Sequence, residues 1–324
     1  MPAVLLGCIS LVGAGALTLI APWDNPVPQQ RDVGSTVKDP TRAPTGSGQV
    51  RVTRYGASFQ LERAESYSSG LARMDHLLGS LDVVRVFYPG TPDAWPGKAP
   101  GRDVVVSFKL DPRAVLAGDH DRDMRSWFRS APRDLDVYWV FWHEPEDEVE
   151  DGSFTAADFR AAFVRLDGLA DETRNPRLIS TVVLMSWSTR EASGRNWQDY
   201  FPAADSVDVL AWDVYNRRGS RGAYSTPTEL LDAPRKAAES VGKPFAVAEL
   251  GSILIDGDSG AGRAQWLRSM GDYFSEHGAV FATYFDFSWN DGVDDYRLRD
   301  APSRTAWREF SADVRGPLET TGSR

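Results

Sequence analysis

Residues 137–146 read VYWVFWHEPE, and residues 244–252 read PFAVAELGS. Each is a run of apolar, β-branched and aromatic side chains, which is typical of a strand covered on both faces. Each run also contains a glutamate near its end, Glu144 in the first and Glu249 in the second. A carboxylate that follows a buried strand either borders a cleft or needs a buried partner, since an unpaired buried charge is costly. These stretches therefore predict both a buried sheet and the place of its chemistry.

Further runs of this kind extend outward from the two stretches, at residues 54–60, 82–90, 103–110, 178–188, 208–216 and 279–290. Amphipathic segments with helical spacing lie between many of the runs, at residues 68–81, 155–173, 226–242 and 263–278. This alternation is typical of repeated βα units. Eight such units form a closed barrel in about 250 residues. We therefore predict an α/β fold, a single (β/α)8 TIM barrel over residues 51–316.

The N-terminal part of the chain has a different composition. Residues 3–21 are apolar and uncharged, which indicates a signal peptide or a membrane or lipid anchor in residues 1–21. Residues 22–50 are rich in Pro, Gly, Ser and Thr and predict a linker, and residues 317–324 predict a disordered tail. We expect a secreted or surface-anchored extracellular protein. A cleaved signal, a lipoprotein at Cys8 and an uncleaved anchor all fit this segment.

Charge and composition exclude several classes of function. The net charge of −10 gives no basic surface for nucleic acid. Cys8 is the single cysteine, so the chain forms no intrachain disulfide and no cysteine-based metal site. Of the four histidines only His143 closes a strand-like run, which argues against a multi-histidine metal centre. No G-x-G-x-x-G turn follows the first run and no G-x-S-x-G elbow is present, so neither dinucleotide binding nor a serine nucleophile is indicated.

Glu144 and Glu249 suit the cleavage of a glycosidic bond. That reaction needs one carboxylic acid to protonate the leaving oxygen and one carboxylate to attack or stabilise the anomeric carbon. The fourth and seventh strands of a barrel end at the same mouth, where chemistry is located in this fold. The pair therefore predicts a glycosidase, and this chemistry requires no metal or organic cofactor. The other interpretation of each glutamate is an ordinary ion pair with a loop arginine.

The strand-end residues resemble those of clan A of the glycoside hydrolases. The triplet Trp142-His143-Glu144 is specifically similar to family 26, whose best-known members are β-mannanases. The resemblance implies that Glu144 is the acid/base, that Glu249 is the nucleophile, and that His143 binds the sugar beside the scissile bond. It also implies that Tyr215 holds the nucleophile and that Trp289 forms an aromatic platform under the reacting sugar.

Residues after Glu144 depart from the typical mannanase pattern. Pro145-Glu146-Asp147-Glu148 begins an acidic run that continues to Asp151. Two interpretations remain open. The run raises the pKa of Glu144 through like charge, or it is a solvated loop without influence on the site.

Other polar and aromatic residues are candidates for substrate binding. Arg85 interrupts the second run, and a buried charge there needs a carboxylate, so we expect it to support the nucleophile. Asp213 and Asn216 lie beside Tyr215 and are candidates for sugar hydroxyls, although Asp213 would equally pair with an arginine that follows it. Aromatic rings stack on the apolar faces of pyranoses, or else they fill the core. The candidates of this kind are Tyr88, Trp95, Trp142, Trp187, Trp197 and Trp212.

The sequence thus predicts a monomeric, retaining glycoside hydrolase acting on a β-linked polysaccharide, with β-mannan favoured. The same chemistry on β-glucan, β-xylan or a polysaccharide made by the producing cell remains an alternative. So does a non-catalytic carbohydrate-binding barrel, which would keep the aromatic cleft without turnover. Sugar identity and endo or exo action depend on loops whose shapes cannot be derived from the sequence.

Overall fold

The computed structural model describes residues 53–95, 97–98, 101–216, 222–289 and 294–313. The predicted signal or anchor (1–21), the linker (22–50) and the C-terminal tail (317–324) lie outside these residues, as do the two predicted ends of the barrel domain. Within the described ranges, no helix has the length and apolarity needed to cross a membrane.

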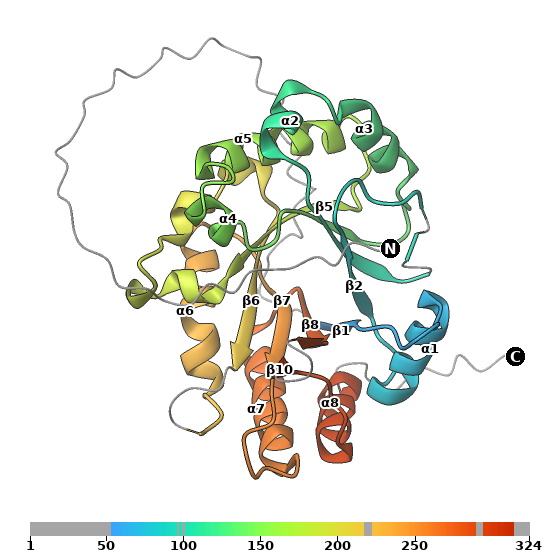
Figure 1. Cartoon of the computed structure of the whole chain (residues 1–324), viewed down its shortest axis with the longest axis vertical. Coiled ribbons are helices and arrows are strands. Elements are labelled where there is room, and N and C mark those ends of the chain that lie inside the picture. The colour runs from blue at the N-terminus through green and yellow to red at the C-terminus, as the bar shows by residue number, and fades with distance from the viewer. Residues whose placement is uncertain (1–52, 96, 99–100, 217–221, 290–293, 314–324) are drawn as a thin grey trace, which may run out of the picture. The chain divides into compact units, whose positions relative to one another are not determined.

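Eight parallel strands form a closed barrel in which each strand pairs with the next along the chain and β8 pairs with β1 (Figure 1). This confirms the predicted (β/α)8 fold. The strands are β1 (Arg54–Phe59), β2 (Val83–Tyr88), β3 (Asp103–Phe108), β4 (Val137–Phe141), β5 (Leu178–Met185), β6 (Val209–Asn216), β7 (Phe245–Ser252) and β8 (Phe281–Asp286). Two short strands after β8, β9 (Ser288–Trp289) and β10 (Asp294–Asp295), pair with each other in antiparallel fashion.

Helices follow most of the strands and surround the barrel in Figure 1. Among the described residues, no helix lies between β2 and β3. They are α1 (Tyr67–Leu78), α2 (Pro112–Ala117), α3 (Asp121–Ser130), α4 (Glu146–Glu150), α5 (Ala156–Asp171), α6 (Pro227–Ser240), α7 (Ala261–His277) and α8 (Ala301–Asp313). Short 3₁₀ helices follow β5: η1 (Ser186–Thr189), η2 (Glu191–Ser193), η3 (Trp197–Tyr200) and η4 (Ala204–Ser206). Thr155 and Thr226 begin α5 and α6 with reciprocal capping boxes, which explains why these two helices begin where the sequence predicts.

Strand side chains alternate between two layers. The inner layer contains strand residues only and fills the barrel: Val83, Val105, Tyr138, Val140, Val183, Val209, Ala211, Ala246, Ala248 and Phe281. The outer layer joins the other faces of the strands to the helices, as where Trp139 stacks on Phe163 of α5 at a centroid distance of 5.0 Å. Because successive residues of a strand point to opposite faces, this division decides which side chains can reach the mouth.

Gly56 marks the closest approach between β1 and β2. A Cβ atom at this position would lie 1.7 Å from the carbonyl oxygen of Val83 and 2.8 Å from its Cγ1. Gly56→Ala should therefore lower the free energy of unfolding by roughly 1–3 kcal/mol or more, because the barrel wall must shift. Gly90→Ala is the matched control, since nothing lies within 4 Å of its Cβ position. Equal denaturant midpoints for the two variants would contradict the close approach.

Candidate active site

The turn after β4 carries Glu144. The strand ends at Phe141 rather than at residue 146, and Trp142 and Glu144 both have left-handed backbones, with φ of 50° and 52°. Such conformations cost about 1–3 kcal/mol each and persist only where the surroundings impose them. Here the Trp142 N–H bonds to the Phe108 carbonyl at 2.9 Å and the Glu144 N–H to the Val183 carbonyl at 3.0 Å. The turn is thus fixed to both neighbouring strands, β3 and β5.

A bulge in β7 directs Glu249 into the barrel. Trp212 of β6 pairs with Val247, and the next residue, Asp213, pairs with Glu249, so Ala248 is one extra residue on β7. Without the bulge, Glu249 would share the outward direction of Phe245 and Val247, which lie in the outer layer. The extra residue turns Glu249 to the inside, as bulges near active sites often do.

Arg85 of β2 joins two carboxylates from different strands. Its Nη2 lies 3.0 Å from Glu249 Oε1, and its Nη1 lies 3.1 Å from Asp213 Oδ1. Nη2 also donates to Asp213 Oδ2 at 3.4 Å, so both Asp213 oxygens are bound by the guanidinium. The hydroxyl of Tyr215 donates to Glu249 Oε2. Asp213 is buried and holds Arg85, while its contact with a sugar hydroxyl stays a prediction.

The carboxyl groups of Glu144, Asp213 and Glu249 surround the Arg85 guanidinium. Burial raises the pKa of Glu144 to about 8, and the negative charges of Glu249 and Glu146 add to this increase. Burial also raises the pKa of Asp213 and of Glu249, while Arg85 opposes both changes and the Tyr215 hydrogen bond opposes the change at Glu249. One guanidinium cannot neutralise three carboxylates, so the cluster retains protons near neutral pH. Among the described residues, none donates a hydrogen bond to the Glu144 carboxyl. The ionised form of Glu144 is therefore the least stabilised of the three carboxylates.

His143 precedes Glu144 in the turn after β4 and contacts Phe87 of β2. Its ring meets Phe87 edge to face at a centroid distance of 5.3 Å. Burial holds the pKa of His143 well below its usual value, and the charges of Arg85 and Lys109 add to this decrease, so the imidazole is neutral at pH 7. Its Nδ1 atom is buried without a hydrogen-bond partner among the described residues.

Trp142 lies at the rim of the barrel. Its ring packs against Phe154 at a centroid distance of 5.0 Å, and its Nε1–H donates to the Leu110 carbonyl. Lys109 Nζ is 4.5 Å from the centroid of the same ring. Trp142 is half-buried and packs against the outer layer, so its side chain is only partly accessible. Lys109 is also close enough to Glu249 for its positive charge to lower the pKa of that carboxyl. Burial, Arg85 and Tyr215 have larger effects on the same pKa.

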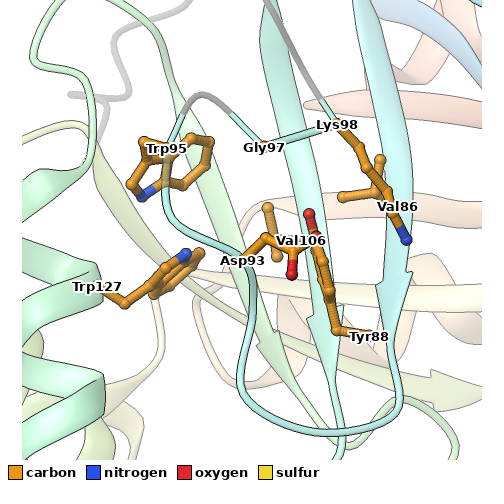
Figure 2. Close-up of a pocket in the computed structure, with 8 residues that line it drawn as sticks. All are labelled: Val86, Tyr88, Asp93, Trp95, Gly97, Lys98, Val106 and Trp127. Atoms are coloured by element: carbon orange, nitrogen blue, oxygen red, sulfur yellow. The ribbon is translucent and has the colours of Figure 1, made fainter. Parts of the chain in front are cut away.

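Tyr88, Trp212 and Asn216 do not point into the barrel, which corrects their prediction as substrate ligands. Tyr88 and Trp212 belong to the outer layer, and Trp212 is 0% exposed. Tyr88 lines a cavity of about 10 Å³, which is too small for a sugar. Figure 2 shows Trp95 and Trp127 on the other side of this cavity. Asn216 is buried and bonds to Ser252 Oγ at 3.0 Å. All three have the outward direction in their strands.

Trp289 belongs to β9 rather than to β8, because β8 ends at Asp286. Its backbone pairs with Asp294 of β10, and its side chain lies outside the described part of the structure. Trp187 of η1 follows the C-terminal end of β5 and is 46% exposed. The other two candidates are less exposed, because Trp95 stacks on Trp127 and Trp197 packs half-buried against the outer layer.

Sequence reasoning missed the inward aromatic residues and one buried acid. Phe87 lies beside Arg85, whose Cζ is 4.9 Å from its centroid, and Phe287 contacts Phe87 at 6.3 Å. The signal for Phe87 is its two-residue spacing from Arg85. Glu146 lies in α4 and is fully buried, so the acidic run is not simply a solvated loop. Among the described residues, no group of three or more His, Cys, Asp or Glu side chains is arranged to hold a metal ion.

Comparison with known proteins bears on the fold. No protein-family model matches the sequence, and no curated protein is similar enough to be matched. A glucosidase from Croceicoccus marinus superposes with a TM-score of 0.59 at 12% identity, covering 81% of this chain and 68% of its own. A modular endo-β-1,4-mannanase of family 26 from Cellulomonas fimi gives 0.54 at 16% identity, covering 81% and 70%.

A family 26 β-mannanase from Bacteroides ovatus gives a TM-score of 0.51 at 12% identity and covers 84% of this chain and 94% of its own. The similar solved structures are mostly family 26 β-mannanases, together with this glucosidase. At this level of identity the likeness concerns the fold. The chain therefore has a barrel whose fold resembles that of the family 26 glycoside hydrolases among these solved structures.

Proposed function

We propose that this protein is a retaining glycoside hydrolase that cleaves a β-linked polysaccharide, with β-mannan as the favoured substrate. The observation that carries the proposal is the contrast between two carboxyl groups at one barrel mouth. Glu249 is held by Arg85 at 3.0 Å and by the Tyr215 hydroxyl. Glu144 has a pKa raised to about 8 by burial and by the charge of Glu249. Paired carboxyls with opposed protonation are what acid-assisted glycoside cleavage requires.

The reaction proceeds in two displacements. In the first, a Glu249 oxygen forms a bond to the anomeric carbon while the bond to the leaving oxygen breaks, and Glu144 gives its proton to that oxygen. In the second, Glu144 takes a proton from water, the water oxygen bonds to the anomeric carbon, and Glu249 leaves as carboxylate. Two inversions at one carbon retain its configuration.

Neighbouring groups assist both steps. Arg85 and Tyr215 keep the attacking carboxylate oriented, and Asp213 keeps Arg85 in place. His143 is neutral and half-buried, and a neutral imidazole can hydrogen-bond a sugar hydroxyl. The partly accessible side chain of Trp142 suits the apolar face of a sugar.

Activity should depend on pH through these two glutamates. The productive enzyme has Glu144 protonated and Glu249 ionised. Because the pKa of Glu144 is raised to about 8, we expect kcat/KM to fall as the pH rises through that value. On the acid side it should fall as Glu249 gains a proton. Initial rates from about pH 4 to about pH 10 measure both limits.

An aryl glycoside with a good leaving group provides the control for this profile. Its departure needs no proton, so the alkaline fall in kcat/KM should disappear while the acid limit remains. An identical alkaline limit for aryl and polymeric substrates would contradict the assignment of Glu144 as the acid.

The proposal is tested by reducing-sugar release from a panel of soluble mannans, glucans and xylans, with Glu249→Ala as the inactive control. Release from mannan that is lost in the variant is the expected result. Release from glucan or xylan alone would support the proposed reaction but reject β-mannan as the substrate. Tight binding to one polymer without release by the wild-type protein would instead identify a non-catalytic carbohydrate-binding barrel.

A further inference from the structure

Glu146 is a buried acid that the proposed reaction does not use. It is the first residue of α4 and is 0% exposed. Its Oε1 accepts a hydrogen bond from the Met185 backbone N–H at 2.9 Å. The backbones of β4 and β5 are paired only as far as Trp139 and Ser180. Beyond that point β5 is joined to the segment after β4 by the Glu144 backbone N–H, which bonds to the Val183 carbonyl, and by the Glu146 carboxyl.

These two bonds fasten the Glu144 turn to β5. The Glu144 N–H bonds to the Val183 carbonyl, and Glu146 bonds to Met185, two residues farther along the same strand. Pro145, with φ of −70°, lies between the two attachment points. Because both ends of this three-residue segment are attached, the left-handed conformation of Glu144 is held from its C-terminal side as well as from its own N–H.

The other carboxylates of α4 form ion pairs. Lys109 Nζ lies 3.1 Å from Glu148 Oε1, and Arg195 Nη2 lies 2.6 Å from Asp147 Oδ1 and also contacts Glu150. Glu146 makes no ion pair with any described residue. It is thus the carboxyl of α4 that is directed inward, toward the end of β5.

We infer that Glu146 is a positioning residue for the acid/base: its carboxyl fixes the turn that carries Glu144, and its negative charge keeps the proton on Glu144. This inference rests on the proposed function, in which Glu144 is the general acid. Glu146 itself touches neither substrate nor the reacting atoms.

The charged and titratable surroundings of both acids agree with this role. After burial, the pKa of Glu144 is changed most by the charge of Glu249 of β7, then by Glu146, Arg85 of β2 and Asp147. The three carboxylates raise this pKa and Arg85 lowers it. Glu144 acts in turn on Asp213 and Tyr215 of β6. The surroundings of Glu146 comprise the backbone N–H groups of Glu146 and Met185, the Ser188 hydroxyl, Arg195 and Tyr200.

Burial raises the pKa of Glu146 to about 7. The backbone N–H groups of Glu146 and Met185, the Ser188 hydroxyl and the charge of Arg195 oppose this increase. Ionisation of Glu146 adds a negative charge close enough to raise the pKa of Glu144. The new negative charge then makes ionisation of Glu144 less favourable, which extends the protonated acid to higher pH.

Two variants separate the two parts of this role. Glu146→Gln keeps an oxygen that accepts from Met185 but removes the charge. We expect kcat near pH 6 within about twofold of wild type, with the alkaline limit of kcat/KM moved to lower pH. Glu146→Ala removes the acceptor too, and should lower kcat by about 10²-fold with KM within about twofold, because the acid is misplaced. Rescue by Gln relative to Ala is the readout that a general loss of stability would not produce.

Glu150→Gln is the matched control, since it makes the same charge change on α4 at a side chain that is 69% exposed. It should leave both kcat and the alkaline limit as in wild type. An unmoved alkaline limit in Glu146→Gln, or a shift of equal size in Glu150→Gln, would overturn the inference. If Glu146→Ala does not fold, the comparison of the two Gln variants decides.

A measurement without substrate separates this inference from the proposed function. In protein labelled with ¹³C at the glutamate carboxyls, the Glu144 resonance is identified by its loss in Glu144→Gln and then titrated. We expect its midpoint to lie at lower pH in Glu146→Gln than in wild type. Such a shift in a protein that cleaves no polymer would support the coupling while the hydrolase proposal fails. An unchanged midpoint would reject the coupling whatever the activity.

Discussion

Glu249→Ala should lower kcat on the natural polymer by about four orders of magnitude or more, while the protein stays folded. The variant removes the atom that attacks the anomeric carbon. It also leaves Arg85 with Asp213 as its remaining carboxylate partner at bonding distance. Asp213 still neutralises this buried cation, so the cluster does not collapse through an unpaired charge. Initial rates of reducing-sugar release measure the loss, and the thermal unfolding midpoint checks the fold.

Added azide should restore part of this activity on an activated aryl glycoside. A small anion can occupy the space left by the Glu249 carboxyl and attack the anomeric carbon directly. A single displacement inverts configuration, so the product should be the glycosyl azide of inverted anomeric form. Wild-type enzyme should give no such product under the same conditions. A Glu249→Ala variant with near wild-type rates would remove Glu249 from the mechanism.

Glu144→Ala should have the second largest effect, and the effect should depend on the leaving group. On the polymer we expect a loss of about 10²–10⁴-fold, because the departing sugar oxygen needs the proton. On an aryl glycoside with a good leaving group the first step needs no acid, so aryl release should persist as a burst. Hydrolysis of the glycosyl–enzyme then becomes slow because the base is absent.

Azide again distinguishes the roles. In Glu144→Ala it should attack the glycosyl–enzyme intermediate and give the glycosyl azide of retained configuration, since two displacements have then occurred. The opposite stereochemistry from that of Glu249→Ala is the decisive comparison. Inverted product from Glu144→Ala, or equal losses on polymeric and aryl substrates, would exchange or reject the assigned roles.

Much of this barrel could be predicted from local sequence. The eight strand-like runs correspond to β1–β8, and the four quoted amphipathic segments correspond to α1, α5, α6 and α7. Strand and helix formation depend on neighbouring side chains and on caps such as Thr155 and Thr226, all of which are adjacent in the chain. Strand ends were less predictable. The run 137–146 is apolar almost to Glu144, yet β4 ends at Phe141 because the backbone there turns left-handed.

The direction of each side chain could not be predicted in the same way. Strands covered on both faces are nearly continuously apolar, so the two-residue alternation that separates inside from outside is absent from the pattern. Tyr88, Trp212 and Asn216 were therefore predicted at the mouth although they face the outer layer. Glu249 reaches the inside through the extra residue Ala248, and a bulge is a property of strand pairing rather than of one strand.

The sequence by itself determined the barrel, because its strands and helices follow from local patterns of apolar and capping residues. It also determined which two glutamates close buried runs. Only the tertiary structure decided their surroundings. The contacts of Arg85 with Asp213 and Glu249, and that of Glu146 with Met185, join segments far apart in the chain. Burial and the few charges at close range set the protonation of these acids, and both are known only once the barrel has closed.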